Sequence, residues 1–240
     1  MKTFTKITAI LLLVLTTTSC FVDGLAGIKG NGDVVTEDRT IHSNFNSIKV
    51  QQGIQVFLTQ GNSTELRVEA DENIIDLLIT EVKNNELKIY FEKNVYKAKS
   101  RNVYLTANEI SKIKTSSGAL VKTENTIETN TIELDSSSGS SIKVTVNANE
   151  ISSSSSSGAN INVYGKAKLF SASASSGSSI DADKLETINT TAKVSSGANI
   201  DVNVSGKLVA KASSGGSIDY EGNPTEVNKD TSSGGSVSGS

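Results

Sequence analysis

The amino-acid sequence predicts an all-β protein: a single-stranded right-handed parallel β-helix (β-solenoid) with about 19 residues per coil, preceded by a less regular β-rich part. The triplet Ser-Ser-Gly occurs seven times at intervals of 18 to 21 residues, a spacing that a low-complexity tract would not keep. A β-branched apolar residue follows each glycine by three positions, and a small residue follows it directly. The seven glycines are Gly118, Gly139, Gly158, Gly177, Gly197, Gly215 and Gly234.

These columns indicate two strands per coil, one leading into the triplet and one leaving it, with inward residues at every second position. One coil cannot bury its apolar side, but coils stacked about 4.8 Å apart pair each strand with its equivalents above and below. The glycine is expected at a bend whose backbone conformation opposes a Cβ, and the serines are expected to form hydroxyl ladders there. The leucine-rich-repeat signature is absent, and the period is about twice that of the calcium-binding nonapeptide β-roll. Regular coils are predicted over residues 108–240, continuous with the preceding part as one domain.

Residues 1–19 have the organisation of a lipoprotein signal peptide. Lysines precede an apolar run over residues 7–15, which is too short to span a bilayer. Cys20, the single cysteine of the chain, is the expected lipidation site, although Thr17 stands where a lipobox usually has leucine. Residues 20–40 are then expected to form a tether. These features predict a cell-envelope protein, lipid-anchored to the outer membrane on its periplasmic or surface face.

The charge balance is mildly acidic once the signal peptide is removed. The chain has 23 Lys and Arg and 26 Asp and Glu; the signal peptide holds two lysines and no acid, so 21 basic residues remain and the net charge is near −5. Nucleic-acid binding needs basic patches, so a nucleic-acid partner is not expected.

Residues 41–107 lack the triplet but carry strong strand signals, and we expect them to form irregular β coils that cap the solenoid. Turns are predicted at residues 60–63 and 84–85, and a short helix within residues 71–78. The strand at residues 103–105 is expected to start the regular stack.

The order of motifs resembles a known family. Gly53-Ile54-Gln55 follows a strand over residues 48–50, and a Leu-Arg-Val-Glu-Ala-Asp run over residues 66–71 precedes the Ser-Ser-Gly coils. This order is similar to the putative auto-transporter adhesin, head GIN domain family, known mainly from Bacteroidetes, over roughly residues 41–237. The resemblance implies an exported or lipid-anchored β-helix with an adhesin-like role. The sequence departs from the name-giving motif at Gln55, where the family has asparagine.

Residues that commonly carry catalysis or metal binding are scarce. His42 is the single histidine, and it lies in a polar stretch. The sequence shows no nucleophile–histidine–acid set, phosphate-binding loop or zinc-ligand spacing. The triplet serines are interchangeable, whereas a catalytic serine needs one activated copy beside a base. We therefore expect no enzyme activity, no catalytic residues, no metal site and no cofactor.

One polar column is a candidate ligand or cation site. Four residues after their glycines, Asp181, Asp201 and Asp219 are expected to stack on an outward face, with Asp183 nearby. Stacked carboxylates repel one another unless a cation or a partner's basic groups compensate. The alternative is that this strand simply faces water, where like charges at that spacing cost little.

Two functions remain open from the sequence. The preferred one is a non-catalytic adhesin-like or scaffolding solenoid, held to the membrane by its N-terminal lipid, with a glycan or protein ligand. The alternative is a polysaccharide-binding or polysaccharide-cleaving β-helix. The last coil, which ends in a Gly- and Ser-rich run without a charged or helical cap, also predicts self-association or a partner at that end.

Overall fold

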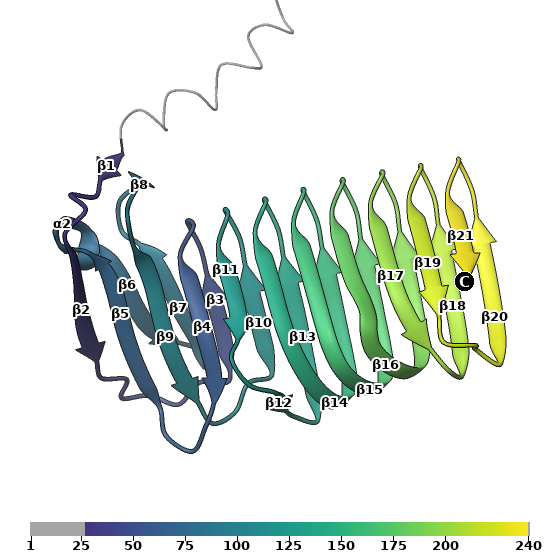
Figure 1. Ribbon diagram of the computed structural model, residues 1–240, viewed down its shortest axis with the longest axis horizontal. Helices are drawn as coiled ribbons and strands as arrows, with labels where there is room; N and C mark the ends of the chain where they lie inside the picture. The colour runs from purple at the N-terminus through teal and green to yellow at the C-terminus, as the bar shows by residue number, and fades with distance from the viewer. Residues whose placement is uncertain (1–26, 240) are drawn as a thin grey trace, which may run out of the picture.

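A computed structural model describes residues 27–239 of the chain, so the predicted signal peptide and Cys20 lie outside the described residues. The protein is an elongated stack of flattened coils (Figure 1). It is nearly all-β, with 64% strand and 2% helix, and the β-solenoid comprises about seven coils spaced about 19 residues apart. The predicted fold class is confirmed.

The first part of the chain contains ten β-strands and one short helix. In chain order the elements are β1 (Ile28–Lys29), β2 (Val34–Arg39), β3 (Ser47–Val50), β4 (Gln55–Gln60), β5 (Glu65–Asp71), α2 (Glu72–Ile75), β6 (Leu78–Lys83), β7 (Glu86–Phe91), β8 (Val95–Lys97), β9 (Arg101–Ala107) and β10 (Lys112–Thr115).

The remaining elements are all strands. They are β11 (Leu120–Thr123), β12 (Ile127–Glu128), β13 (Thr131–Ser136), β14 (Ser141–Ser155), β15 (Asn160–Ala174), β16 (Ser179–Val194), β17 (Asn199–Val204), β18 (Lys207–Ala212), β19 (Ser217–Glu221), β20 (Glu226–Thr231) and β21 (Ser236–Gly239).

The strands form two faces that enclose the core. The strands that lead into the turns, which we call the incoming sheet, lie in the order β6-β7-β3-β10-β13-β14-β15-β16-β18-β20. The strands that leave the turns, the outgoing sheet, lie in the order β2-β5-β9-β4-β11-β14-β15-β16-β17-β19-β21. The long strands β14, β15 and β16 contribute to both sheets because each bends at the corner opposite the turns.

Each Ser-Ser-Gly triplet forms a tight turn of type I′. The second serine has φ between 48° and 55° and the glycine between 66° and 77°, as this turn requires at both central positions. The residue after the glycine donates its N–H to the first serine's carbonyl, as from Ala159 to Ser156 at 3.2 Å. The glycine N–H donates to the next turn, as from Gly158 to the carbonyl of Ser176 at 3.1 Å. Backbone hydrogen bonds therefore hold the row of turns together.

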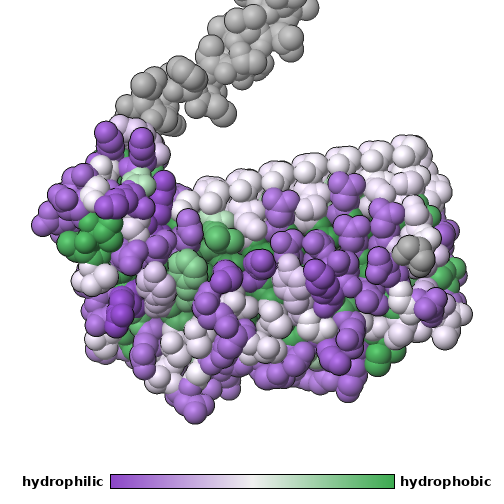
Figure 2. Space-filling view, viewed as in Figure 1, coloured by the Kyte–Doolittle hydropathy of each residue, from purple (hydrophilic) through white to green (hydrophobic). Residues whose placement is uncertain are grey.

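The predicted hydroxyl ladder does not form among the triplet serines, although buried hydroxyls just inside the turns do bond between coils, as those of Thr115 and Ser136 do at 2.9 Å. Of the fourteen triplet serines, only Ser116 makes a side-chain hydrogen bond with another described residue, accepting one from the Gln51 amide at 3.2 Å. The second serine of each triplet is exposed because the turn projects beyond the two sheets, and Figure 2 shows a pale band of near-neutral hydropathy along this edge. Serine fits here because its short polar side chain is compatible with an exposed turn.

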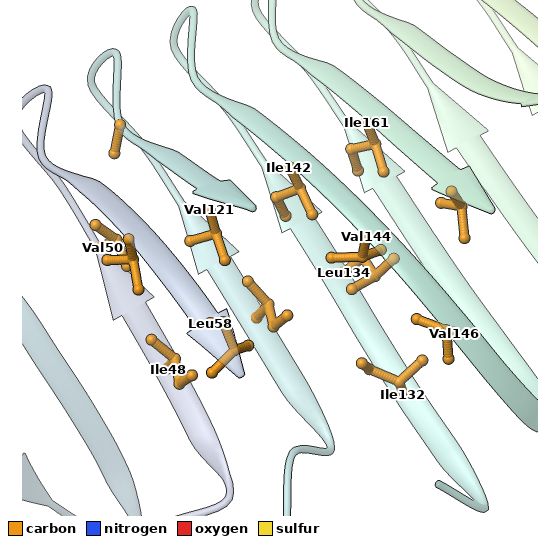
Figure 3. Close-up of a cluster of buried hydrophobic side chains, with 14 of the residues drawn as sticks. Ile48, Val50, Leu58, Val121, Ile132, Leu134, Ile142, Val144, Val146 and Ile161 are labelled. Carbon is orange, nitrogen blue, oxygen red and sulfur yellow. The ribbon is translucent and has the colours of Figure 1, made fainter. Parts of the chain in front are cut away.

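The core lies between the two sheets and follows the predicted columns. Figure 3 shows inward side chains of neighbouring coils at the same level of successive strands. Fully buried members of the column three residues after the glycine are Val121, Ile142, Ile161, Ile180, Ile200 and Ile218. Stacked β-branched side chains suit this pleated interior.

The coil formed by β3 and β4 is inserted between parts of the chain that follow it. β3 pairs with β7 on one side and β10 on the other, and β4 pairs with β9 and β11. The expectation that residues 103–105 start the regular stack is therefore wrong. These residues belong to β9, which is separated from the first regular outgoing strand, β11, by β4. Pattern alone could not show this, since the strands that cover β3 and β4 come later in the sequence.

The far side of this coil is closed by antiparallel strands: β5 pairs with β9, β2 with β5, and β6 with β7. The predicted turn at Asn84-Asn85 connects β6 to β7, with φ of 51° and 63°. The expected helix is the single turn α2, which Arg39 holds by donating to the carbonyls of Ile75 and Leu78. No helix within residues 27–239 is long and apolar enough to cross a membrane.

The predicted tether over residues 20–40 is too long. β1 pairs with β8, and β2 joins the outgoing sheet, so residues 28–39 belong to the fold. The fully buried carboxylate of Asp71 fastens this segment: it accepts N–H bonds from Gly32 at 2.9 Å, Lys99 at 3.0 Å and Ser100 at 2.9 Å. The predicted self-association through the C-terminal end stays a prediction.

Candidate functional site

The outward face of the outgoing sheet carries a row of side chains in exact register, one from each strand. The inward column three residues after each turn glycine is β-branched and apolar throughout, whereas this outward row changes its chemistry along the solenoid. In spatial order the row is Asp38, Arg67, Tyr104, Phe57, Lys122, Lys143, Asn162, Asp181, Asp201, Asp219 and Ser238. The row begins with charged and aromatic residues and ends with three aspartates and a serine, so its two ends are suited to different ligands.

The acidic end contains the predicted aspartate column. Asp181 pairs in register with Asp201, and Asp201 pairs with Asp219, so the structure brings the three together as expected. Asp183 and Glu221 add two further carboxylates to the lining of a 410 Å³ hollow. The remaining lining residues are Val202, Tyr220, Ser238 and Gly239.

Partial burial and mutual repulsion disfavour the charged forms of Asp201 and Asp181. Burial raises the pKa of Asp201, and the neighbouring Asp219 and Asp181 raise it further. Burial likewise raises the pKa of Asp181, and the negative charge of Asp183 raises it further. No lysine or arginine lines this hollow among the described residues.

The cation role of this column gains no support from its geometry. Within residues 27–239, no group of three or more His, Cys, Asp or Glu side chains is arranged to hold a metal ion. The strands direct these carboxylates outward side by side, whereas a cation site needs oxygens that converge on one point. A partner's basic groups remain a way to offset the repulsion.

The other end of the row contains a hollow that the sequence did not reveal. It measures 560 Å³ and is lined by residues of β2, β4, β5 and β9. The rings of Phe57 and Tyr104 stack beside it, with centroids 5.1 Å apart and planes at 15°. Both residues were recognisable as strand residues, but their contact depends on the pairing of β4 with β9, which are 41 residues or more apart in the chain.

The family motif Gly53-Ile54-Gln55 is a structural element of the β3–β4 coil. Gln52 and Gly53 have φ of 59° and 70°, the values of the Ser-Gly pairs, and the Gly53 N–H donates to the Ser117 carbonyl at 3.0 Å. Ile54 is fully buried at the position where the regular coils have alanine, serine or glycine. The motif is therefore the first of eight stacked turns, and the side chain of Gln55 is exposed on β4.

The other candidate residues do not gather at a site. His42 is exposed in the loop between β2 and β3, and its imidazole has no hydrogen-bond partner among the described residues. Cys20 lies outside the described residues.

Comparison with known proteins agrees with this architecture. The profile of the family "Putative auto-transporter adhesin, head GIN domain" matches residues 44–224, which is more than half of the chain. The chain belongs to this family. The matched region includes the β3–β4 coil and the regular stack up to β19. Membership in this adhesin-like family fits a non-enzymatic role in the cell envelope.

Solved structures share the fold. A putative adhesin from Bacteroides fragilis superposes with a TM-score of 0.83 at 21% identity, covering 89% of this chain and all (100%) of that one. A putative lipid binding protein from Parabacteroides distasonis gives 0.71 at 21% identity, with coverages of 89% and 99%. A putative adhesin from Parabacteroides merdae gives 0.68 at 19% identity, with coverages of 89% and 98%. No curated protein matches the chain.

Proposed function

We propose that the protein is a non-catalytic, adhesin-like rod of the cell envelope, anchored to the outer membrane through a lipid on Cys20, that binds a glycan or protein partner with the outer face of its outgoing sheet. The observation that carries this proposal is the in-register row from Asp38 to Ser238. The inward column of the same sheet, three residues after each turn glycine, is uniformly β-branched and apolar, whereas the outward row changes from charged and aromatic residues to acids. A rigid sheet that presents varied side chains at fixed spacing is suited to recognition.

The chemistry of the surface supports binding over catalysis. The one histidine, His42, is exposed; it directly follows Ile41, which lines the hollow at the Asp38 end of the row, but it is not itself a lining residue of either hollow. Among the described residues, no triplet hydroxyl is hydrogen-bonded to an acidic, basic or histidine side chain; the one that is bonded, Ser116, accepts from the Gln51 amide. Membership in an adhesin-like family adds weight to the same role.

The anchoring can be tested with Cys20→Ser in cells that produce the full chain. We expect the wild-type protein to incorporate labelled palmitate and to sediment with membranes, and the variant to do neither while remaining folded and exported. A Thr17→Ser variant is the matched control, because it changes the cleavage region and leaves the thiol. Full membrane retention of Cys20→Ser would contradict the anchor.

The binding role needs a cellular experiment. Cells carrying the wild-type gene, a deletion and Cys20→Ser would be compared for retention on surfaces coated with mucin, collagen or killed cells of the same strain. We expect the deletion to lose retention on at least one surface and Cys20→Ser to lose it equally. Unchanged retention of the deletion strain on every surface would overturn the proposal.

The polysaccharide-cleaving alternative has one specific observation in its favour, the raised pKa values of Asp181 and Asp201 in the acidic hollow. Cleavage by paired carboxylates requires one protonated and one ionised acid. Reproducible depolymerisation of a glycan by the purified protein, abolished by Asp201→Ala, would establish this alternative in place of the non-catalytic role.

A further inference from the structure

The hollow beside Phe57 and Tyr104 has the dimensions and the lining of a ligand site. Its volume of 560 Å³ lies within the range of roughly 300–1,000 Å³ that is usual for such sites. Strands β2, β5, β9 and β4 form its floor, and all four are paired in register. The floor is therefore rigid before any ligand arrives.

The aromatic pair supplies an apolar contact surface. Phe57 and Tyr104 stand side by side on the outward face, and Tyr104 remains 40% exposed. A partly exposed stack of two rings is a large apolar feature on a surface that is otherwise mostly hydrophilic, as Figure 2 shows for the side in view. Covering such rings with apolar C–H groups of a ligand is favourable.

The rim supplies polar groups that the fold does not need. Arg67 lies next to Tyr104 in the row, and its guanidinium contacts the Asp38 carboxylate at 2.9 Å. The two side chains are 61% and 79% exposed, so the ion pair adds little to stability. Threonine hydroxyls without a hydrogen-bond partner among the described residues also line the hollow; they belong to Thr40, Thr59, Thr64 and Thr106.

The charges of the hollow are nearly balanced. Arg39 and Arg67 stand against Asp38, Glu65 and Glu124. Two partners lie just outside the lining: Lys122 pairs with Glu124 at 2.9 Å, and Glu37 pairs with Arg39 at 3.1 Å. A polyanion or a strongly basic peptide would therefore find no net attraction here. A suitable ligand is uncharged, carries many groups that both donate and accept hydrogen bonds, and has an apolar edge for the rings. Neutral sugars meet all three requirements.

We propose that this hollow binds a neutral oligosaccharide, whose ring C–H groups pack on the Phe57–Tyr104 pair while its hydroxyls bond to the Arg67–Asp38 pair and the threonines. The inference rests on the proposed binding function and names the ligand class for one part of the outgoing sheet. Donor and acceptor meet in the Arg67–Asp38 pair, which matches the two capacities of a sugar hydroxyl.

The test uses the purified full chain and a set of neutral hexasaccharides, namely those of cellulose, starch, mannan, xylan and chitin, with binding measured by calorimetry. We expect at least one to bind, Tyr104→Ala to weaken that binding at least tenfold, and Arg67→Ala to weaken it about fivefold. Tyr96→Ala is the matched control, because Tyr96 is a 51% exposed tyrosine outside the hollow. It should change the affinity less than twofold.

The outcomes separate this inference from the adhesion role. Binding of none of the hexasaccharides, equal losses in Tyr104→Ala and Tyr96→Ala, or a preference for hexagalacturonate over all neutral chains would each overturn the glycan site. If the deletion strain still loses retention on coated surfaces in that case, the adhesion role stands without the glycan. If retention is unchanged but a hexasaccharide binds through Tyr104, the glycan site stands and adhesion fails.

Discussion

At the scale of single residues, the turn glycine is the position on which the repeat depends. A Cβ built on Gly158 meets no atom within 4 Å, so space does not require glycine there. Its φ of 70° does, because this left-handed conformation costs a residue with a Cβ about 1–2 kcal/mol. The neighbouring Ser157, with φ of 53°, also adopts a left-handed conformation and so already carries a similar conformational cost.

We expect Gly158→Ala to lower the free energy of unfolding by about 1 kcal/mol, measured by urea denaturation followed by circular dichroism. Ser157→Asn is the matched control, because asparagine tolerates left-handed φ better than most residues, and it should leave stability unchanged or raise it. Equal destabilisation by both changes would mean that the serine hydroxyls contribute after all.

Asp71 is the buried acid that fastens the N-terminal strands. Burial raises its pKa, but N–H bonds from Ser100, Lys99 and Gly32 lower it by more, so the pKa lies below its ordinary value of 3.8. We expect Asp71→Asn to cost about 2 kcal/mol at pH 7, because the charged acceptor of three backbone donors is lost. Denaturant unfolding measures this, and the exposed Asp33→Asn should change stability by less than about 0.5 kcal/mol.

The pH dependence of Asp71 follows from the direction of its shift. A lowered folded-state pKa means that the stability contributed by the ionised carboxylate is fully present above the ordinary pKa. That contribution is lost as the pH falls through the folded-state value. The gap in stability between wild type and Asp71→Asn should therefore close in acid below about pH 4; a gap that stays constant would contradict the charged-acceptor explanation.

The pKa of Asp201 is shifted in the opposite direction from that of Asp71. Its pKa is raised, so the folded protein binds a proton more tightly than the unfolded chain, and stability falls as the pH rises through the raised value. We expect Asp201→Asn to raise the free energy of unfolding at pH 7 by about 0.5 kcal/mol, because like charges opposite one another on paired strands are removed. Asp230→Asn, which removes the partner of Lys211, should bring no gain. A loss of stability in Asp201→Asn would show that the column is already compensated.

At the scale of elements, the β3–β4 coil joins the irregular end to the regular stack. Its turn has the geometry of the Ser-Ser-Gly turns, but a buried isoleucine replaces the small residue that follows the glycine. The family motif is thus explained by packing and turn geometry.

We expect Ile54→Ala to destabilise the protein by about 3 kcal/mol, because a fully buried isoleucine is lost. Gln55→Asn, which restores the usual family motif, should change stability by less than about 0.5 kcal/mol, since the Gln55 side chain is exposed. Thermal unfolding of both variants would measure this. A large effect of Gln55→Asn would indicate a role for the third motif position that the fold does not reveal.

At the scale of the whole molecule, each regular coil contacts only its two neighbours, so stability is nearly a sum over coils. Deletion of residues 157–175 removes one coil and joins Ser156 to Ser176 in the same turn position. We expect the shortened protein to fold with an unchanged circular dichroism shape and a lower unfolding temperature. Deletion of residues 45–60 should prevent folding, because β7, β9, β10 and β11 would lose their common partner. If the protein lacking residues 157–175 also fails to fold, the stack folds as one indivisible unit.

Much of the scaffold was predictable from the sequence because a solenoid repeats the same turn and the same inward packing in every coil. The spacing of Gly158 and Gly177, and of Ile161 and Ile180, carries the register directly, since each residue lies over its equivalent one coil away. The aspartate column followed from the same arithmetic. The absence of metal-binding geometry in this column could not be predicted in the same way. Spacing shows which residues are neighbours, but it does not show whether their carboxylates point toward a common centre.

The sequence by itself determined the period, the turns, the inward columns and the stacking of Asp181, Asp201 and Asp219, all of which depend on contacts between equivalent positions. Only the tertiary structure decided that β3 and β4 lie between later strands, that residues 28–39 belong to the fold, and that Phe57 meets Tyr104. These features depend on pairings between strands that share no repeat. Nothing in a local pattern specifies such partners, because they are selected by how the whole cap buries its apolar surface.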